Sequence, residues 1–209
     1  MTLYHAAVQG ETDVVRALLL AGADPDEEST ADTEGLPLCA AAAWGHTGAV
    51  LALLDAGADP DRREDVDRSA MAALHWAVSG EHLDVLELLL ARGADPDVLD
   101  GVGRTPLSHA AEKGAAAVVR ALLAHGADRG IADGQGKTPL DHALRYAGTD
   151  VEAEVLARAK EHAPEGARFT VVRDDAGITV ETRDASGALR SERRLGTGHG
   201  EIAALLNSR

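Results

Sequence analysis

The chain has few aromatic residues, and it has a single cysteine. Aromatic side chains make up 2% of its 209 residues, whereas apolar residues make up 45%. The core must therefore be built from Ala, Leu and Val, which suits thin helices that pack closely. One cysteine, Cys39, excludes a disulfide within the chain. No apolar run approaches the ~20 residues of a membrane-spanning helix, and the N-terminus lacks the features of a signal peptide, so we expect a cytoplasmic protein.

Basic residues are scarce in the first part of the chain. The formal net charge is −15, and the first 61 residues carry one basic side chain, Arg16, against eleven acidic ones. Such a field repels nucleic acid and anionic lipid, and it speeds encounter with a basic partner. We therefore expect a protein partner with a basic surface, and neither nucleic acid nor a membrane. The simpler alternative is that an acidic, Arg-rich and Lys-poor composition, typical of a bacterial protein, serves solubility.

One phrase recurs at intervals of 33 to 36 residues. The copies are LLLAGADPD at 18–26, LLDAGADPD at 53–61, LLARGADPD at 89–97 and the weaker LLAHGADRG at 122–130. Self-similarity at this period indicates a stack of similar units, each of which contacts mainly its neighbours.

The fourth unit shows how each unit is built, because GRTPLSHAAEKG precedes AAAVVRALLAHGAD there. Thr105 can cap a first helix that begins at Pro106, where a missing N–H costs nothing. Gly114 ends that helix. The second helix carries valines and leucines at helical spacing, and Gly126 supplies the left-handed residue that terminates it. Each unit is thus predicted to be a pair of short helices followed by a turn.

This pattern resembles the ankyrin repeat. The matching segments are LYHAAVQG from Leu3, GLPLCAAAAWGH from Gly35, LHWAVSGEH from Leu74, GRTPLSHAAEKG from Gly103 and GKTPLDHALRYAG from Gly136. The resemblance implies a mainly α fold, an ankyrin-repeat solenoid whose helix pairs are joined by β-hairpin fingers. The expected repeat domain, 1–163, divides into units at about 1–33, 34–68, 69–100, 101–133 and 134–163. The second helix of the fifth unit is expected at 149–162, as a charged terminal helix.

Residues 164–209 follow a different pattern, which matches no family known to us. Short alternating segments at 168–173, 178–183 and 188–194 are separated by turn residues and predict a three-stranded antiparallel β-meander. Its expected apolar face comprises Phe169, Val171, Ile178, Val180 and Leu189, covered by a short helix at 201–206. About 45 residues are marginal for independent folding. We therefore expect this extension to pack on the last repeat or on another subunit, giving a monomer or a weak oligomer through its strands, and the repeats to remain folded without it.

The histidines have structural interpretations. The resemblance implies that His75, in the TPLH motif, hydrogen-bonds backbone between repeats, and that His46 and His82 fill a structural GH position. Cys39 shares the register of His75 and needs no nucleophilic role. Another register contains His5, His109 and His142, but adjacent repeats lie ~10 Å apart, too far for a shared metal. No catalytic residue, cofactor or metal site is predicted.

Two further motifs invite a ligand interpretation. The DPD triplets are interpreted as turns, because no glycine and glutamate follow them at the spacing of a calcium loop. GTGHG at 196–200 lies between a strand and a helix and is suited either to an anion or to a flexible connection.

The resemblance also implies which residues meet a partner. The finger positions are Glu27, Glu28, Asp32, Glu34, Arg62, Arg63, Asp65, Asp67, Arg104, Gln135 and Lys137. The first-helix positions are Trp44, Ser79, Glu112, Lys113, Arg145 and Tyr146. Trp44 is a candidate anchor, whereas Trp76 is predicted to be core.

Three classes of function follow. The first is a non-enzymatic protein-binding module, for example an immunity or inhibitor protein that covers a basic toxin or nuclease. The second is a regulatory or accessory protein that binds a small molecule or anion near the C-terminal extension. The third, an enzyme, lacks any catalytic constellation in the sequence.

Overall fold

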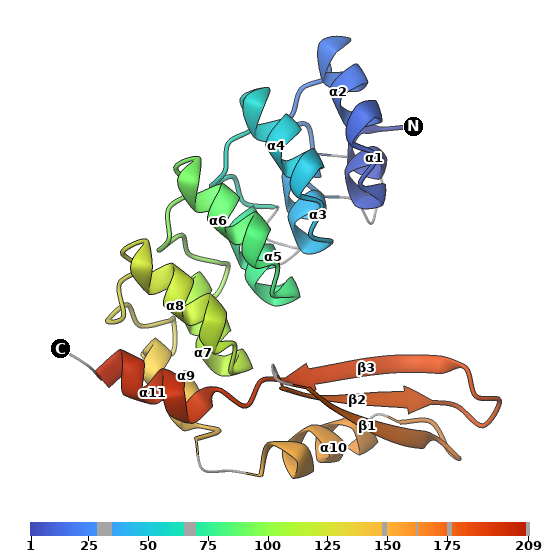
Figure 1. Cartoon of the computed structure of the whole chain (residues 1–209), viewed down its shortest axis with the longest axis vertical. Helices are drawn as coiled ribbons and strands as arrows, with labels where there is room; N and C mark the ends of the chain where they lie inside the picture. The colour runs from blue at the N-terminus through green and yellow to red at the C-terminus, as the bar shows by residue number, and fades with distance from the viewer. Residues whose placement is uncertain (29–34, 65–69, 148–149, 162, 175–176, 208–209) are drawn as a thin grey trace.

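The computed structural model describes residues 1–28, 35–64, 70–147, 150–161, 163–174 and 177–207. Four helix pairs stack side by side from the N-terminus (Figure 1). They are α1 (Leu3–Gln9) with α2 (Thr12–Leu20), α3 (Pro37–Ala43) with α4 (Thr47–Asp55), α5 (Ala73–Gly80) with α6 (Leu83–Ala91), and α7 (Pro106–Lys113) with α8 (Ala116–Ala124). The predicted helix-turn-helix repeats are confirmed. Among the described helices, none has the length and apolar character needed to cross a membrane.

The ends of the helices are set by local chemistry. The Thr105 hydroxyl accepts a hydrogen bond from Ser108 N at 3.2 Å, and Pro106 occupies the first turn of α7. Gly114 ends the helix with a φ of 76°, which lies in the left-handed region that glycine adopts without a Cβ penalty. The caps predicted for this unit are therefore confirmed.

The DPD turns link neighbouring units. The carboxylate of Asp26 accepts a hydrogen bond from Asp59 N, that of Asp61 from Asp95 N, and that of Asp97 from Asp128 N, at 2.8 to 3.1 Å. These residues are turn residues, as predicted, and they also join one turn to the next. The described parts of the later fingers close as hairpin turns through the pairs Asp100 N to Arg104 O and Asp133 N to Lys137 O.

The core of the array consists of small and branched apolar side chains. Leu53, Leu86, Leu89 and Leu122 are fully buried among alanines and valines of both helix rows. A core without aromatic bulk lets the helices approach closely, as the composition indicates.

The predicted β-meander is confirmed. Strands β1 (Arg168–Asp174), β2 (Gly177–Arg183) and β3 (Leu189–Leu195) form an antiparallel sheet in the order β1-β2-β3. The prediction that Leu189 belongs to the packed face is wrong, since its side chain is exposed. A register shift between Thr182 and Arg183 inserts an extra residue into β3 and turns Leu189 away, so Leu195 packs instead.

Helix α10 (Val151–Glu161) covers this sheet. Val155 and Ala159 pack against Val180 and Leu195, and the contacts of the helix fall on β2 and β3. The prediction that residues 149–162 supply the second helix of the fifth unit is therefore wrong. Amphipathic spacing fits a helix to any apolar surface, and here the sheet provides that surface.

Helix α11 (His199–Asn207) lies beside the first helix of the fifth unit, where the second helix of that unit was predicted to pack. It packs on α9 (Pro139–Leu144) and also contacts α7 and α8, while Ile202 and Leu206 enter the core of the repeats. Figure 1 shows α11 beside α9 and below α8, with the sheet projecting from the end of the array. The expectation that this helix covers the strands is wrong. The fifth unit is split, and residues 145–198, which we call the inserted unit, lie between its two helices.

The GTGHG segment confirms the register of α11. His199 Nε2 donates to Glu112 O at 2.9 Å, two residues before Gly114, just as His46 donates to Val8 O two residues before Gly10. Gly196 N and Gly198 N also donate to Lys113 O and Gly114 O. The segment therefore packs against the end of α7, and its interpretation as an anion site or as a flexible connection stays a prediction. The predicted domain boundary at residue 163 stays a prediction, and the packing of α11 on α9 leads us to propose the alternative that the extension is inserted within the fifth repeat.

Candidate functional site

The first helices of the N-terminal units surround a hollow of about 350 Å³. The residues that line it are Tyr4, Cys39, Ala40, Ala43, Trp44, Glu64, Trp76, Ser79 and Gly80. We call it the aromatic hollow, because Tyr4, Trp44 and Trp76 are three of the five aromatic residues in the whole chain. Most of the few aromatic side chains thus lie on one part of the first-helix side, by which we mean the side of the array formed by the first helix of each repeat.

Each aromatic side chain is positioned by its repeat. Trp44 follows α3 as its C-cap and is 64% exposed, which places its indole at the rim. Trp76 is half-buried against the core, and its Nε1 donates to Glu64 Oε2 at 3.0 Å. The prediction of Trp76 as core is thus only partly right, since its indole also lines the hollow.

Sequence reasoning missed several of the lining residues, Tyr4 and Glu64 among them. Tyr4 has the same register in the first unit as Cys39 and His75 in later units, and this register could have placed it beside Cys39. Glu64 lies at the start of a long finger, where the sequence gives no signal of its direction. Its side chain points inward because the Trp76 indole holds its carboxylate.

The hollow lies in a negative field. Burial raises the pKa of the Cys39 thiol, and the charges of Glu64, Glu28 and Asp26 raise it further. The same carboxylates that disfavour a thiolate on the floor of the hollow favour a cation at its mouth. Cys39 itself is buried, with its Sγ 3.8 Å from Met71 O, which agrees with the predicted structural role.

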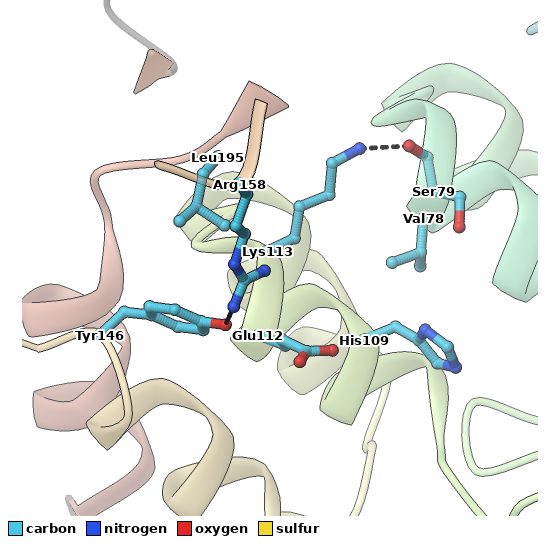
Figure 2. Close-up of a pocket in the computed structure, with 8 residues that line it drawn as sticks. All are labelled: Val78, Ser79, His109, Glu112, Lys113, Tyr146, Arg158 and Leu195. Atoms are coloured by element: carbon cyan, nitrogen blue, oxygen red, sulfur yellow. Dashed lines mark hydrogen bonds between the residues drawn. The ribbon is translucent and has the colours of Figure 1, made fainter. Parts of the chain in front are cut away.

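A second hollow, of about 310 Å³, lies where the inserted unit meets the repeats. Figure 2 shows its lining residues, which are Val78, Ser79, His109, Glu112, Lys113, Tyr146, Arg158 and Leu195. Its cations are paired within the molecule. Arg158 donates to the Tyr146 hydroxyl and to Glu154, while Lys113 donates to Ser79 O and lies 3.4 Å from Glu81. These contacts stabilise the region where the inserted unit meets the repeats.

The structure separates the predicted first-helix contacts into two groups. Trp44 and Ser79 are exposed, whereas Tyr146 is only 3% exposed, under the inserted unit. The prediction that Tyr146 meets a partner is wrong, because Arg158 and His199 cover its ring. Glu112, Lys113 and Arg145 remain predictions. Glu112 is joined to Arg104 at 2.6 Å and to Arg145 at 3.8 Å.

The finger residues are distributed along the array. Glu27, Arg62, Gln135 and Lys137 are exposed, and Glu28 is half-buried. Arg63, which is also exposed, donates to Leu99 O at 3.2 Å and so reaches the next unit. Arg104 is half-buried, and the other four, Asp32, Glu34, Asp65 and Asp67, lie outside the described residues. Their role stays a prediction from the sequence.

The histidines have the structural roles that were predicted. His75 Nε2 donates to Arg104 O at 3.1 Å, and His82 Nε2 donates to Ala43 O at 3.1 Å. Burial, with a further contribution from the charge of His109, lowers the pKa of His75 to about 4. Within the described parts of the chain, no group of three or more His, Cys, Asp or Glu side chains could hold a metal ion.

The comparisons with known proteins identify the repeats. A family model described as ankyrin repeats (3 copies) matches residues 3–100 and 74–162. A search of the curated proteins found no match. Ankyrin repeats are generally protein–protein interaction modules, and the family is typically non-enzymatic. Matched over most of its length and built from stacked helix pairs, the chain belongs to the ankyrin repeat family.

Proposed function

We propose that this array binds a basic protein through the N-terminal half of its first-helix side. The observation that carries the proposal is the exposed indole of Trp44 at the rim of the aromatic hollow. Tryptophan is enriched among the few interface residues that carry most of the binding free energy. A partner that covers Trp44 would remove a large apolar surface from water, which favours association.

The charge distribution supports a basic partner. Eleven acidic side chains and one basic side chain occupy the first 61 residues. Glu27 and Glu28 lie in the first finger, and Glu64 lines the hollow. Opposite charge on a partner would raise the association rate and suppress wrong partners. An immunity or inhibitor protein directed at a basic toxin or nuclease is one form of this function.

No observation favours the alternative of a small molecule or anion near the extension. The backbone N–H groups of Gly196 and Gly198 already donate to carbonyls of α7 and its cap. The cations of the second hollow have carboxylate or hydroxyl partners. Their charge is therefore neutralised within the molecule, which weakens attraction for a free anion.

The test is a kinetic one. The partner is identified by cross-linked capture, and its binding is then measured for the wild-type chain, Trp44→Ala and Leu20→Ala. Leu20 is an exposed apolar residue at the end of α2 and serves as the matched control. We expect Trp44→Ala to speed dissociation about 30-fold, corresponding to ~2 kcal/mol, and Leu20→Ala to change nothing. Equal effects of the two substitutions, or none, would contradict the proposal.

A further inference from the structure

We propose that two copies of this chain pair through the outer edge of strand β1, so that their two sheets join into one antiparallel sheet of six strands. The proposal concerns the inserted unit and goes beyond the proposed binding of a basic protein. It is carried by the unprotected edge of β1, on a sheet that projects from the end of the array (Figure 1).

The outer edge of β1 can accept another strand. β1 pairs with β2 along its whole length, from Arg168 opposite Arg183 to Asp174 opposite Gly177. Among the residues that the structure describes, no other segment pairs with β1. In an antiparallel ladder, every second residue directs its N–H and C=O away from the partner strand. The outer side of β1 therefore presents backbone groups that a further strand would satisfy.

The two edges of the sheet differ in how they resist such pairing. Four of the seven residues of β3 are charged, and a register shift at Thr182 and Arg183 interrupts its ladder with β2. Charges and bulges are devices that blunt an edge strand. β1 has neither over its central residues, FTVV at 169–172, and its ladder with β2 is regular. Within this segment, the side chain of Val172 is 44% exposed.

The sequence of β1 is compatible with pairing to itself. An antiparallel pair that is symmetric about Val171 overlaps all seven residues of both strands. Thr170 then lies opposite Val172 of the second copy, and the exposed part of the valine is covered. Arg173 lies opposite Phe169 of the second copy, at the ~5 Å spacing of cross-strand pairs, where a guanidinium can stack on an aromatic ring. No arginine of β1 faces another in this register.

Helix α10 leaves room for this pairing. Its contacts with the sheet fall on β2 and β3. Glu152 of α10 holds Arg173 at 2.5 Å, which neutralises the guanidinium but leaves the arginine side chain 61% exposed. The two-fold axis of a symmetric strand pair is perpendicular to the sheet, so both copies of α10 would lie on one face, about four strand spacings or ~19 Å apart. Packed helices lie ~8–10 Å apart, so the two copies would not collide.

Charge favours contact through this part of the molecule. Residues 164–209 carry seven basic and seven acidic side chains, whereas the first 61 residues have a balance of −10. Two copies that met through their N-terminal units would repel each other, but two copies that meet through their sheets bring neutral parts together. Figure 1 shows the sheet at the other end of the stack from the acidic units. A second copy of this chain is therefore the occupant that the edge of β1 fits.

Sedimentation velocity of the full chain tests the proposal. Because two edge strands form a small interface, we expect a reversible monomer–dimer equilibrium with a dissociation constant on the order of 100 µM, measured up to ~500 µM. The mean mass should rise from 21.7 kDa toward twice that value. Val172→Lys places a charge in the edge and should weaken self-association about tenfold or more. Leu189→Lys, at an apolar residue of the β3 edge that is 48% exposed, is the matched control and should leave self-association unchanged.

Two double variants test the register. Thr170→Lys with Val172→Lys puts like charges opposite each other twice in the dimer, so the chain should be monomeric over this range of concentration. Thr170→Lys with Val172→Glu puts unlike charges opposite each other and should restore the dimer. Both variants carry Thr170→Lys, and urea unfolding of each shows whether it is folded. A difference between them then reports the pairing of the strands.

Each contrary result has a distinct meaning. A wild-type chain that stays monomeric over the whole range would overturn the proposal and leave the edge to an extended segment of another protein. Equal effects of Val172→Lys and Leu189→Lys would overturn the assignment of the contact to β1. A monomeric Thr170→Lys, Val172→Glu variant would overturn the pairing about Val171. None of these results bears on Trp44→Ala, which tests the proposed function separately.

Discussion

His75 connects two repeats from a position where it cannot easily carry a charge. It is fully buried, its Nε2 donates to Arg104 O, and its Nδ1 accepts from Ala72 N at 3.3 Å. Protonation would place a proton on the nitrogen that faces the Ala72 donor. Burial and the charge of His109 together lower the pKa of His75 to about 4. The stack is thus stabilised by a neutral imidazole.

The neutral state of the buried His75 imidazole predicts that the folded protein loses stability in mild acid. The folded pKa of His75 lies below the unfolded value of about 6.5, so its contribution is complete above pH 6.5 and is lost as the pH falls toward 4. The shift corresponds to about 3 kcal/mol of unfolding free energy at most. Burial also lowers the pKa values of His109 and His199, which act in the same direction.

Urea denaturation between pH 7.5 and 4.5 checks this prediction. We expect the unfolding free energy of the wild type to fall toward acid, and that of His75→Gln to fall less steeply. His5→Gln, at an exposed histidine of α1, is the control and should follow the wild type. Parallel pH profiles of the wild type and His75→Gln would rule out a contribution from this residue.

Residue roles that depend on a few neighbours could be predicted from the sequence. The cap at Thr105, the left-handed Gly126 and the turn carboxylates are set within one repeat period, and each is confirmed. The burial of Tyr146 could not be predicted, because its cover comes from Arg158 and from His199, which is 53 residues further along the chain. Likewise, Glu64 enters the candidate site through a tertiary hydrogen bond to an indole.

At the scale of elements, two helices can compete for the same surface. The sequence just after α9 contains α10 at the distance expected of a repeat, but α10 packs on the sheet, and α11 packs on α9. Propensity and amphipathic spacing do not decide between them, since both helices have an apolar side. The signal that could have decided is the GH pair at 198–199, which repeats the GH pair at 45–46.

The split repeat predicts the outcome of a deletion. Removing residues 146–197 joins Arg145 to Gly198 and recreates the order Ala43, Trp44, Gly45, His46 of the second unit. We expect this shortened chain to unfold cooperatively as a five-unit array. A chain ending at residue 163 should instead be less stable by ~3 kcal/mol or more, because it lacks Ile202 and Leu206 from the core.

Thermal and urea unfolding of the two shortened chains provide the measurement. They retain the same four N-terminal helix pairs and differ in whether α11 or the sequence of α10 follows α9. If the chain ending at 163 matched or exceeded the stability of the internal deletion, α11 would not complete the fifth unit. The sequence-based prediction was that the repeats remain folded without residues 164–209, and the present one adds that the shortened chain loses stability.

At the scale of the whole molecule, charge is polarised along the array. The first 61 residues have a balance of −10, whereas residues 164–209 carry seven basic and seven acidic side chains. Figure 1 places the first units at one end of the stack and the sheet at the other. A basic partner would therefore be drawn to the end that holds the aromatic hollow, which gives one orientation of approach an advantage in rate.

The last prediction concerns the rate at which a basic partner associates with the acidic end of the array. Replacing Glu27 and Glu28 by glutamine removes two charges from the first finger. Exposed charges at the rim of an interface act on association and its salt dependence more than on dissociation. We expect roughly three- to tenfold slower association with the partner at low ionic strength, a flatter salt dependence, and an unchanged unfolding free energy. Stopped-flow binding over a range of salt concentrations measures the association rate and its salt dependence. Urea titration measures the unfolding free energy.

The matched control removes the same charge from the row of second helices. Asp84 and Glu87 are exposed on α6, in the row of second helices, and Asp84→Asn with Glu87→Gln changes the net charge by the same two units. If net charge alone steered the partner, both double variants would slow association equally, and the proposed placement of the interface would be wrong. Slower association confined to the Glu27 and Glu28 variant would locate the partner at the first finger. Because dissociation depends on buried contacts, adding Trp44→Ala to that variant should then raise the dissociation rate without slowing association further.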